Sequence, residues 1–298
     1  MKIFNFGSLN MDKVYRVKEF VSGGQTIAAM DLQTYPGGKG LNQSVAVARA
    51  GGHVYHVGCV GDDGDFLTQF LLSDHVNCDF LKTVEGVNGH AVIQVDQKGQ
   101  NCIIVYPGAN HKLEKAYIDR VFENIGKDDI ILLQNETNLV GYIMEKGGEK
   151  GTRVVFNPSP VTDDLIKYPL HLVSTFILNE PEASAISGES QTQDALCALT
   201  NQYPNAEFVL TLGEKGSIYR FKNEEVRFNI FKTKTVDTTG AGDTYCGYFL
   251  ACTACGMKPK TAMIYATAAS AIAVSKKGAA SSIPDRDTVE AFLKKIYE

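Results

Sequence analysis

The chain has 298 residues, 44% of them hydrophobic and 21% charged, so it is long enough for one large globular domain and is not of disordered composition. Its net charge of −5, with scattered basic residues, argues against a nucleic-acid surface. We find no stretch near the roughly 20 apolar residues of a membrane span and no signal peptide, and therefore expect a cytoplasmic protein.

Short apolar runs alternate with amphipathic stretches along the first two thirds of the chain. The apolar runs predict strands at Ile3–Phe6, Val54–Val60, Asp129–Leu133, Arg153–Phe156, Thr175–Leu178 and Phe208–Leu212. The amphipathic stretches predict helices at Asn42–Ala50, Phe66–Leu72, Lys115–Asn124, Val140–Lys150 and Asp194–Gln202. This alternation favours parallel pairing, so we predict an α/β fold of three layers, α/β/α, around a mostly parallel sheet, with functional groups at the carboxyl ends of the strands.

Two segments interrupt the alternation, at about residues 13–35 and 88–106, because neither has helical periodicity. In the second, Ala91–Val95 and Cys102–Val105 flank a turn-rich hexapeptide, which is typical of a hairpin. We expect both segments to form a small β-sheet that projects as a lid from a single domain spanning residues 1–298. Its apolar alternation favours pairing of two such lids in a homodimer.

The last third of the chain predicts helices at Ala241–Cys255, Lys260–Val274 and Asp287–Tyr297. Seven cysteines without an export signal are expected to be reduced, and we interpret Cys252 and Cys255 as core residues of a helix, because no second pair completes a zinc site. His53 and His56 are expected to be solvated or hydrogen-bonded structural residues.

The sharpest functional signal is the string Thr-Val-Asp-Thr-Thr-Gly-Ala-Gly-Asp-Thr at 235–244, where a β-prone run opens into an apolar helix. Unobstructed N–H groups of Gly240, Ala241 and Gly242 at a helix start would form an anion hole. A carboxylate at Asp243 beside a phosphate is useful where it takes a proton from an acceptor hydroxyl, so we predict Asp243 as a catalytic base for phosphoryl transfer. The alternative is a plain glycine turn with a favourable first-turn charge.

Two other nucleotide sites are disfavoured. The chain has no G-x-x-x-x-G-K-[ST] motif, which excludes a P-loop enzyme. Tyr245 stands where a dinucleotide-binding motif would have its third glycine.

A second cluster lies near the N-terminus, where Gly7–Asp12 follows the first strand and Gly37–Asn42 precedes the first helix. Asn10, Asp12 and Asn42 offer donors and acceptors suited to a polyol, and the glycines allow close approach of a ligand. Taken alone, each string could be an ordinary turn.

Together these strings resemble the ribokinase-type carbohydrate kinase family, which also holds fructokinases and adenosine kinases. Gly-Gly-Lys-Gly-x-Asn-Gln at 37–43 and Asp-Thr-x-Gly-Ala-Gly-Asp-Thr at 237–244 resemble its two signatures, about 200 residues apart. Further matches, covering the whole chain, are Gly61–Asp63, Pro107–Asn110, Asn157–Pro160, Asn179–Glu182 and Thr211–Gly216.

The resemblance implies ATP-dependent phosphorylation of the primary hydroxyl of a small sugar, with Mg²⁺ as cofactor and K⁺ as activator. D-ribose, which would give ribose 5-phosphate, is the first candidate. The alternatives are a fructokinase-like, nucleoside or other sugar kinase, and a sugar-binding regulator without catalytic activity.

The resemblance also assigns roles residue by residue. It implies that the sugar is held by Asn10, Asp12, Gly38, Lys39, Asn42, Glu136 and Asp243. It implies that the nucleotide is bound by Asn179, Thr211, Gly213, Gly216, Gly242 and Thr267. Asn179 and Glu182 are implied to organise Mg²⁺, although both could also cap a helix. The implied monovalent-cation loop comprises Asp237, Thr239, Ala273, Lys276, Gly278 and Ser282. Thr267 replaces a histidine found near adenine in several bacterial relatives, which leaves the adenine contacts open.

Overall fold

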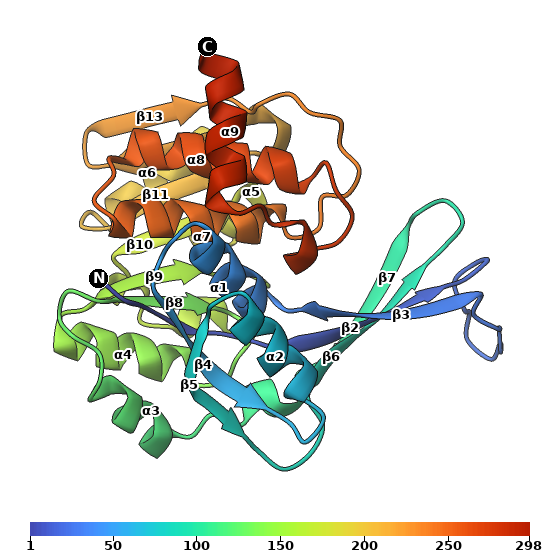
Figure 1. The fold of residues 1–298 in the computed structure, drawn as a ribbon. Helices are drawn as coiled ribbons and strands as arrows, with labels where there is room; N and C mark the ends of the chain where they lie inside the picture. The colour runs from blue at the N-terminus through green and yellow to red at the C-terminus, as the bar shows by residue number, and fades with distance from the viewer.

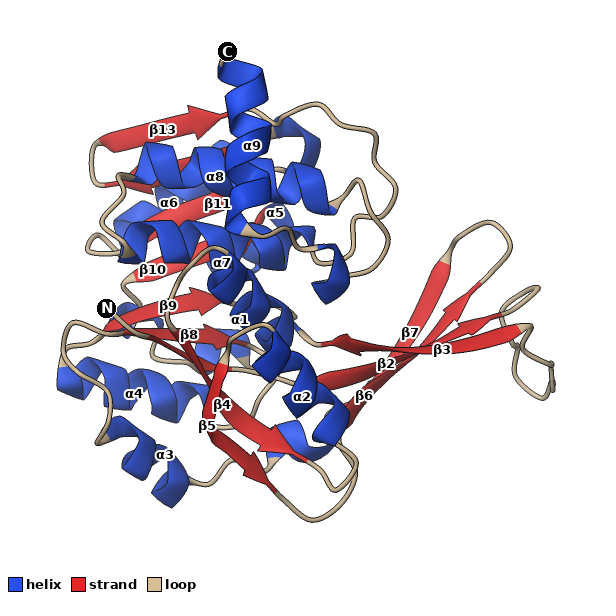
Figure 2. Ribbon diagram, viewed as in Figure 1, coloured by secondary structure: helices blue, strands red, loops and turns tan.

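The computed structural model describes residues 1–298 and contains two separate sheets (Figures 1 and 2). The large sheet has nine strands in the order β13-β12-β11-β10-β9-β8-β1-β4-β5. Seven of them pair in parallel, and the two antiparallel pairings, β11–β12 and β12–β13, lie at one edge. The strands are β1 (Ile3–Phe6), β4 (Val54–Val60), β5 (Asn77–Thr83), β8 (Ile130–Gln134), β9 (Arg153–Asn157), β10 (Thr175–Asn179), β11 (Glu207–Thr211), β12 (Ser217–Phe221) and β13 (Glu224–Phe228).

Helices cover both faces of this sheet. One face carries α1 (Lys39–Arg49), α2 (Asp65–Ser73), α7 (Ala241–Ala254), α8 (Pro259–Ala273) and α9 (Arg286–Tyr297). The other carries α3 (Lys115–Phe122), α4 (Val140–Lys150), α5 (Glu180–Ser187) and α6 (Thr192–Gln202). Short 3₁₀ turns lie at Gly108–His111, Leu165–Lys167, Leu170–Leu172, Gly213–Lys215 and Ala280–Ser282.

Alternation along the central strands builds the two cores. In β8, Ile130 and Leu132 join the core beneath α7 and α8, whereas Ile131 and Leu133 join the core beneath α3 and α4. Because successive strand residues point to opposite faces, a strand covered on both sides must be apolar throughout. The predicted three-layer, mostly parallel α/β/α fold is confirmed.

The small sheet projects to one side of the molecule (Figure 1). Its order is β3-β2-β6-β7, with β2 and β6 parallel and both outer pairs antiparallel. Its strands are β2 (Asn10–Arg16), β3 (Asp31–Gly37), β6 (Gly89–Val95) and β7 (Asn101–Tyr106). The sheet begins at Asn10 rather than near residue 13, so the chain passes from β1 into it through only three residues.

Two edge strands that the sequence analysis did not predict lie where burial is incomplete. The edge strands β5 and β13 carry polar residues on faces that are only half buried, which hides their apolar pattern. Helix α1 also begins three residues earlier than predicted, because Lys39 and Gly40 form part of its first turn.

All seven cysteines are free. Cys252 is buried as expected, but Cys255 is exposed at the end of α7, because the helix turns its last residues toward solvent. We find no helix with the length and apolar character needed to cross a membrane. His56 is a hydrogen-bonded core residue between Ser44 Oγ (2.9 Å) and the carbonyl of Gly7 (3.1 Å), and burial lowers its pKa to about 4.

Candidate active site

The polar residues of interest converge where the two sheets meet. Parallel pairing sets Gln134 at the end of β8 beside Asn157 at the end of β9, and Asn179 at the end of β10 beside Thr211 at the end of β11. The end of β1 leads directly into β2 of the small sheet, and β3 returns from that sheet into α1 (Figure 1). The two signature strings, far apart in sequence, are thereby placed side by side.

Helix α7 begins with free amide groups. Gly240 is its N-cap and adopts a left-handed backbone with φ of 74°, which favours glycine. The N–H of Ala241 donates to Thr238 O at 3.2 Å, whereas those of Gly240, Gly242 and Asp243 donate to no protein acceptor. A side chain added at Gly242 would meet nothing within 4 Å. This helix start is therefore open and electropositive, although one of the three predicted amides is already engaged.

Asp243 stands in the first turn of α7 with only 7% of its surface exposed. Its Oδ2 accepts a hydrogen bond from Asn42 Nδ2 and its Oδ1 accepts one from Gln43 Nε2, both at 2.9 Å. These bonds join the late glycine string to the early one. The predicted base thus lies beside the predicted polyol-binding residues.

The Glu136 carboxylate lies against the backbone at the start of α1, within the electrostatic influence of the Lys39 side chain. The Glu136 carboxylate accepts hydrogen bonds from the Lys39 N–H at 2.8 Å and from the Ser8 hydroxyl. Burial raises the pKa of Glu136, and the Ser8 bond and the Lys39 charge oppose that shift. The carboxylate of Asp243 raises the pKa of Lys39 most strongly, and Glu136 acts in the same direction, so this cation remains charged among the acids around it.

The small sheet supplies Asn10 and Asp12. Asn10 is 5% exposed, and its Oδ1 accepts a hydrogen bond from Asn110 Nδ2 at 2.7 Å. A Cβ at Gly37 would lie 2.1 Å from Asp12 Oδ2, so the glycine leaves the space that the carboxylate fills. Burial, followed by the charge of Glu136, raises the pKa of Asp12 to about 7.

One buried polar atom in this cluster has no partner. The Oδ1 of Asn42, on a side chain that is 5% exposed, receives no hydrogen bond, although the Nδ2 of the same group is paired with Asp243. An unsatisfied buried acceptor costs roughly 1–3 kcal/mol. A hydroxyl group bound beside Asn42 would satisfy it.

Asn179 and Glu182 form a capping box at the start of α5. Asn179 Oδ1 accepts from the Glu182 N–H at 2.9 Å, and the Glu182 carboxylate accepts from the Asn179 N–H at 3.0 Å and from Asn179 Nδ2 at 2.9 Å. Glu182 is 3% exposed, and burial raises its pKa. Because the cap already uses these oxygens, the pair fits a Mg²⁺ ion bound mainly through water and phosphate oxygens.

The residues expected at the nucleotide lie on neighbouring elements. Thr211 ends β11 and donates to Leu178 O at 3.1 Å, and Gly213 and Gly216 bound the 3₁₀ turn that follows. Thr267 lies buried in α8, which packs against α7.

The predicted cation loop has its centre at Asp237. One carboxylate oxygen accepts from the Thr239 N–H (2.9 Å) and hydroxyl (2.6 Å), and the other accepts from the Gly278 N–H at 3.0 Å. Burial would raise the pKa of Asp237, but these three hydrogen bonds outweigh it and lower the pKa. The structure therefore brings residues 237–239 against residues 274–278. Ala273 O accepts the N–H of Lys276, and Ser282 Oγ donates to Ala279 O.

Sequence reasoning assigned no role to a group of largely buried carboxamides behind Asp243. They are Asn5, Gln43, Gln134 and Asn157. For the three in strands, the signal that could have revealed them is a polar residue within, or at the end of, an otherwise apolar strand, as in Ile3-Phe4-Asn5-Phe6. Gln43 lies in α1 and has no such signal.

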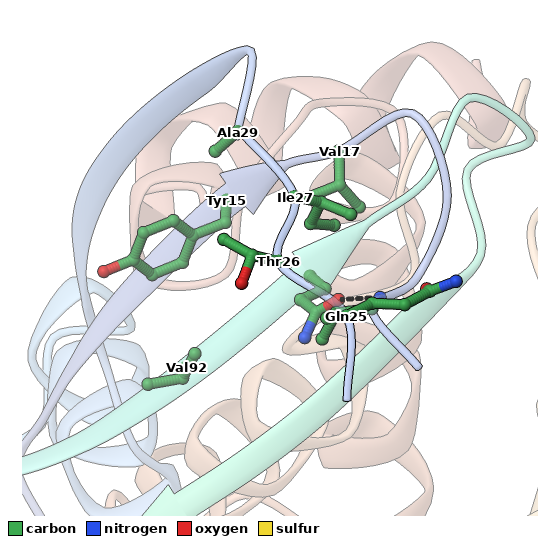
Figure 3. A pocket seen from close by; sticks show the side chains of 9 residues that line it. Tyr15, Val17, Gln25, Thr26, Ile27, Ala29 and Val92 are labelled. Atoms are coloured by element: carbon green, nitrogen blue, oxygen red, sulfur yellow. Dashed lines mark hydrogen bonds between the residues drawn. The ribbon is translucent and has the colours of Figure 1, made fainter. Parts of the chain in front are cut away.

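A separate cavity of about 330 Å³ lies on the small sheet (Figure 3). Its lining comes from the sheet and from the loop between β2 and β3, and consists of Tyr15, Val17, Val21, Gln25, Thr26, Ile27, Ala29, Val92 and Gln94. It contains no carboxylate and no cation, so it has no group that could act on a phosphate. The chemistry is better served by the cluster around Asp243.

The chain is similar to known proteins over nearly its whole length. The model of the family described as pfkB family carbohydrate kinase matches residues 1–286. A ribokinase of Schizosaccharomyces pombe is 35% identical, over 95% of both chains. The solved structure of a Thermotoga maritima ribokinase superposes with a TM-score of 0.86 at 36% identity, over 98% of both chains. An Arabidopsis thaliana ribokinase complexed with ribose and ATP gives 0.86 at 28% identity, also over 98% of both chains.

The raised pKa of Asp12 predicts a pH-dependent stability. Between about pH 4 and 7 the folded state keeps a proton on Asp12 that the unfolded state has lost, so the free energy of unfolding falls as the pH rises through this window. Asp12→Asn lacks this proton and should not show the fall. The free energy of unfolding of the variant, relative to that of the unmodified protein, should therefore be higher at pH 8 than at pH 5, by on the order of 1–2 kcal/mol after allowing for partial exposure. Urea unfolding at both pH values measures this difference.

Thr34→Ser on the adjacent strand removes no titratable group and serves as the control. A stability difference for Asp12→Asn that is equal at pH 5 and pH 8 would contradict the predicted proton uptake.

Proposed function

This chain belongs to the pfkB family of carbohydrate kinases, and from that membership we propose that it transfers the γ-phosphoryl group of ATP to the primary hydroxyl of D-ribose, giving ribose 5-phosphate and ADP. One observation carries the proposal. A buried carboxylate, Asp243, lies beside the free amides that open α7 and is hydrogen-bonded to Asn42 of the predicted sugar cluster.

The reaction forms one bond and breaks another. The primary hydroxyl oxygen attacks the γ-phosphorus while its proton passes to the Asp243 carboxylate. The bond between the γ-phosphorus and the bridging oxygen breaks, and the electron pair leaves with ADP. The N–H groups of Gly240 and Gly242 stabilise the charge on the transferring group, and the weakly engaged N–H of Ala241 can join them.

The sugar is proposed to lie between α1, Glu136 and the small sheet. Asn10, Asp12, Gly38, Lys39, Asn42 and Glu136 provide polar atoms to its hydroxyls. The unpartnered Oδ1 of Asn42 accepts one of these hydroxyls, and the charge of Lys39 counters the acids that surround the ligand. Hydrogen bonds of this kind select for ligands with matching hydroxyl groups.

The nucleotide is proposed to lie along the ends of β10 and β11. Asn179, Thr211, Gly213, Gly216 and Thr267 line its path, with Gly242 at the γ-phosphate. Mg²⁺, when bound with the nucleotide near Asn179 and Glu182, would neutralise phosphate charge. Burial raises the pKa of Glu182, and a cation bound nearby would favour its charged form.

A monovalent cation such as K⁺ is proposed beside the anion hole. Asp237 would provide a carboxylate, and Thr239, Ala273, Lys276, Gly278 and Ser282 would complete the loop. The hydrogen bonds that lower the pKa of Asp237 keep it ionised, as a cation site requires. A Cβ at Gly240 would lie 3.1 Å from Ala279, so this loop packs close to the start of α7 and its ordering would support that helix start.

The small sheet is proposed to act as a lid that excludes water from the sugar and as the contact surface of a homodimer. All six residues of its edge strand β7 are exposed, and Ile103 to Tyr106 form an apolar run. An exposed apolar edge strand is unfavourable unless another chain covers it. ATP dependence and seven free thiols favour the cytoplasm as the location.

The alternatives differ in substrate or in class. A fructokinase-like, nucleoside or other sugar kinase would use the same base with another acceptor. A sugar-binding regulator would bind without turnover, but a buried carboxylate beside free helix amides is an arrangement that phosphoryl transfer uses and sugar binding alone does not require. The relatives described above are ribokinases, which favours ribose.

Release of ADP from the purified chain tests the function. We expect turnover with ribose to exceed that with 2-deoxyribose, fructose, glucose and adenosine. Removing Mg²⁺ should abolish turnover, and replacing Na⁺ by K⁺ should raise it. Faster turnover with another acceptor would overturn the ribose assignment, and sugar binding without ADP release would favour the regulator.

Asp243→Asn should lower kcat by about 10²–10⁴-fold while leaving ribose binding largely intact, because the amide keeps the shape but cannot take the proton. Steady-state kinetics and calorimetric binding of ribose measure the two effects. Asp287→Asn is a matched control, since Asp287 is an exposed first-turn acid of α9, remote in sequence from both signatures. Near-normal turnover of Asp243→Asn would remove this residue from the role of base.

The dimer is proposed to form through the sheet face that carries Asp12. Paired residues share a face, and the register places Ile103 and Val105 on the face of Val14 and Asp12. Ile103→Glu should therefore weaken the dimer about tenfold or more, as judged by sedimentation equilibrium. Ile104→Glu, one residue along and on the opposite face, should leave it unchanged. Equal effects of both substitutions would contradict the proposed face.

A further inference from the structure

Gln43 follows Asn42 in α1 and is completely buried. Its Nε2 donates to Asp243 Oδ1 at 2.9 Å and to Asn157 Oδ1 at 3.0 Å. Its Oε1 accepts from Gln134 Nε2 at 2.8 Å and from the thiol of Cys246 at 3.5 Å. All four hydrogen-bonding positions of the carboxamide are therefore occupied.

These partners allow only one orientation of the Gln43 side chain. A 180° flip of the amide would point Oε1 at the oxygens of Asp243 and Asn157, and would set Nε2 against the donating Nε2 of Gln134. Two acceptor pairs and one donor pair would then face each other in a buried site, and each unmade bond would be costly. The donor that meets Asp243 is thus fixed before any ligand arrives.

The network behind Gln43 is anchored in the sheet. Gln134 ends β8 and also donates to Asn5 Oδ1 of β1 at 2.8 Å. Asn5 in turn donates to the carbonyl of Gly40 and to Ser44 Oγ, both at 2.8 Å. Gln43 is therefore held by two central strands as well as by its own helix.

The same carboxamide links Asp243 to the start of α5. Asn157, which receives the second Nε2 hydrogen, donates to Ile177 O at 2.9 Å and to Glu182 Oε2 at 3.4 Å. Helices α1 and α7 also meet closely, since a Cβ at Gly247 would lie 2.4 Å from Ala46 Cβ and 2.9 Å from Gln43 O. The geometry leaves little freedom for Asp243 to move relative to Gln43.

We propose that Gln43 is a positioning residue that fixes the Asp243 carboxylate through Oδ1, leaves Oδ2 to face the acceptor hydroxyl, and stabilises the ionised form of the base. The inference rests on the proposed kinase function. Asn42 meets Oδ2 but also belongs to the sugar cluster, so its bond can rearrange when sugar binds. Gln43 has no ligand to exchange for Asp243, and its bond therefore persists through the reaction.

The charges around Asp243 make its ionisation sensitive to the hydrogen bond that Gln43 donates. The carboxylate interacts electrostatically with the cation of Lys39, with Glu136 and Glu182, and with the thiol of Cys246. A hydrogen bond to the charged form of an acid favours that form. Loss of the Gln43 donor should therefore make the base harder to ionise as well as less well oriented.

Gln43→Met tests the proposal because methionine has a similar length but no hydrogen-bond donor. We expect kcat at saturating ribose and ATP to fall about 10–100-fold, with the KM for ribose changed less than about threefold, because the sugar contacts stay in place. The acid limb of the kcat–pH profile should move up by about one unit. A purely structural role of Gln43 would leave the position of this limb unchanged.

Gln43→Glu is the second variant, and it keeps the shape of the side chain. The new carboxyl group can donate to Asp243 only while it is protonated. We therefore expect kcat to be partly restored at low pH relative to Gln43→Met, and to fall as the pH rises and the second carboxylate ionises against Asp243. Cys246→Ala is the matched control. It removes a buried contact to Gln43 but leaves the Asp243 bond, so it should change neither kcat nor the profile appreciably.

The outcomes distinguish a failure of the proposed kinase function from a failure of the proposed role of Gln43. An unmodified protein without kinase activity would overturn the proposed function, and this inference with it. An active protein whose folded Gln43→Met and Gln43→Glu variants keep both kcat and the acid limb would overturn the role of Gln43 alone. If Gln43→Met fails to fold, as thermal denaturation would reveal, Gln43→Glu decides the question.

Discussion

The contact between the first turns of α1 and α7 is the constraint on which the rest of the structure depends. Each helix begins at a glycine-rich string, and Asn42 and Gln43 of one reach the two oxygens of Asp243 of the other. A buried carboxylate is costly unless it is paired, and here two carboxamides pair it. The chain therefore holds an ionisable acid at a helix start whose remaining amides stay free for an anion.

The two sheets contribute different groups to the candidate site. The parallel sheet contributes fixed groups at the ends of its central strands, because strands buried on both faces cannot move without disrupting two cores. The small sheet contributes Asn10 and Asp12 from strands with far less buried surface. Rigid groups thus lie at the side proposed to bind phosphate, and groups on a projecting sheet lie at the side proposed to bind the sugar.

Sequence patterns predicted this arrangement well where burial is complete. The central strands were recognised because burial on both faces makes them apolar throughout, and the glycine strings were recognised because close approach excludes side chains. Edge strands β5 and β13 escaped notice because their exposed faces are polar. Gln43 and Gln134 were given no role because their roles depend on partners about 90 to 200 residues away, which no local pattern reveals. The engaged amide of Ala241 depends on loop geometry in the same way.

A crystal structure with ribose, ADP, Mg²⁺ and aluminium fluoride tests the proposed site most directly, because aluminium fluoride mimics the phosphoryl group in the transition state of transfer. We predict that its fluorides accept hydrogen bonds from the N–H groups at the start of α7, with the Asp243 carboxylate in hydrogen-bond contact with the primary hydroxyl of ribose. A fluoride group bound away from this helix start, with Asp243 turned from the sugar and paired only to protein, would contradict the account.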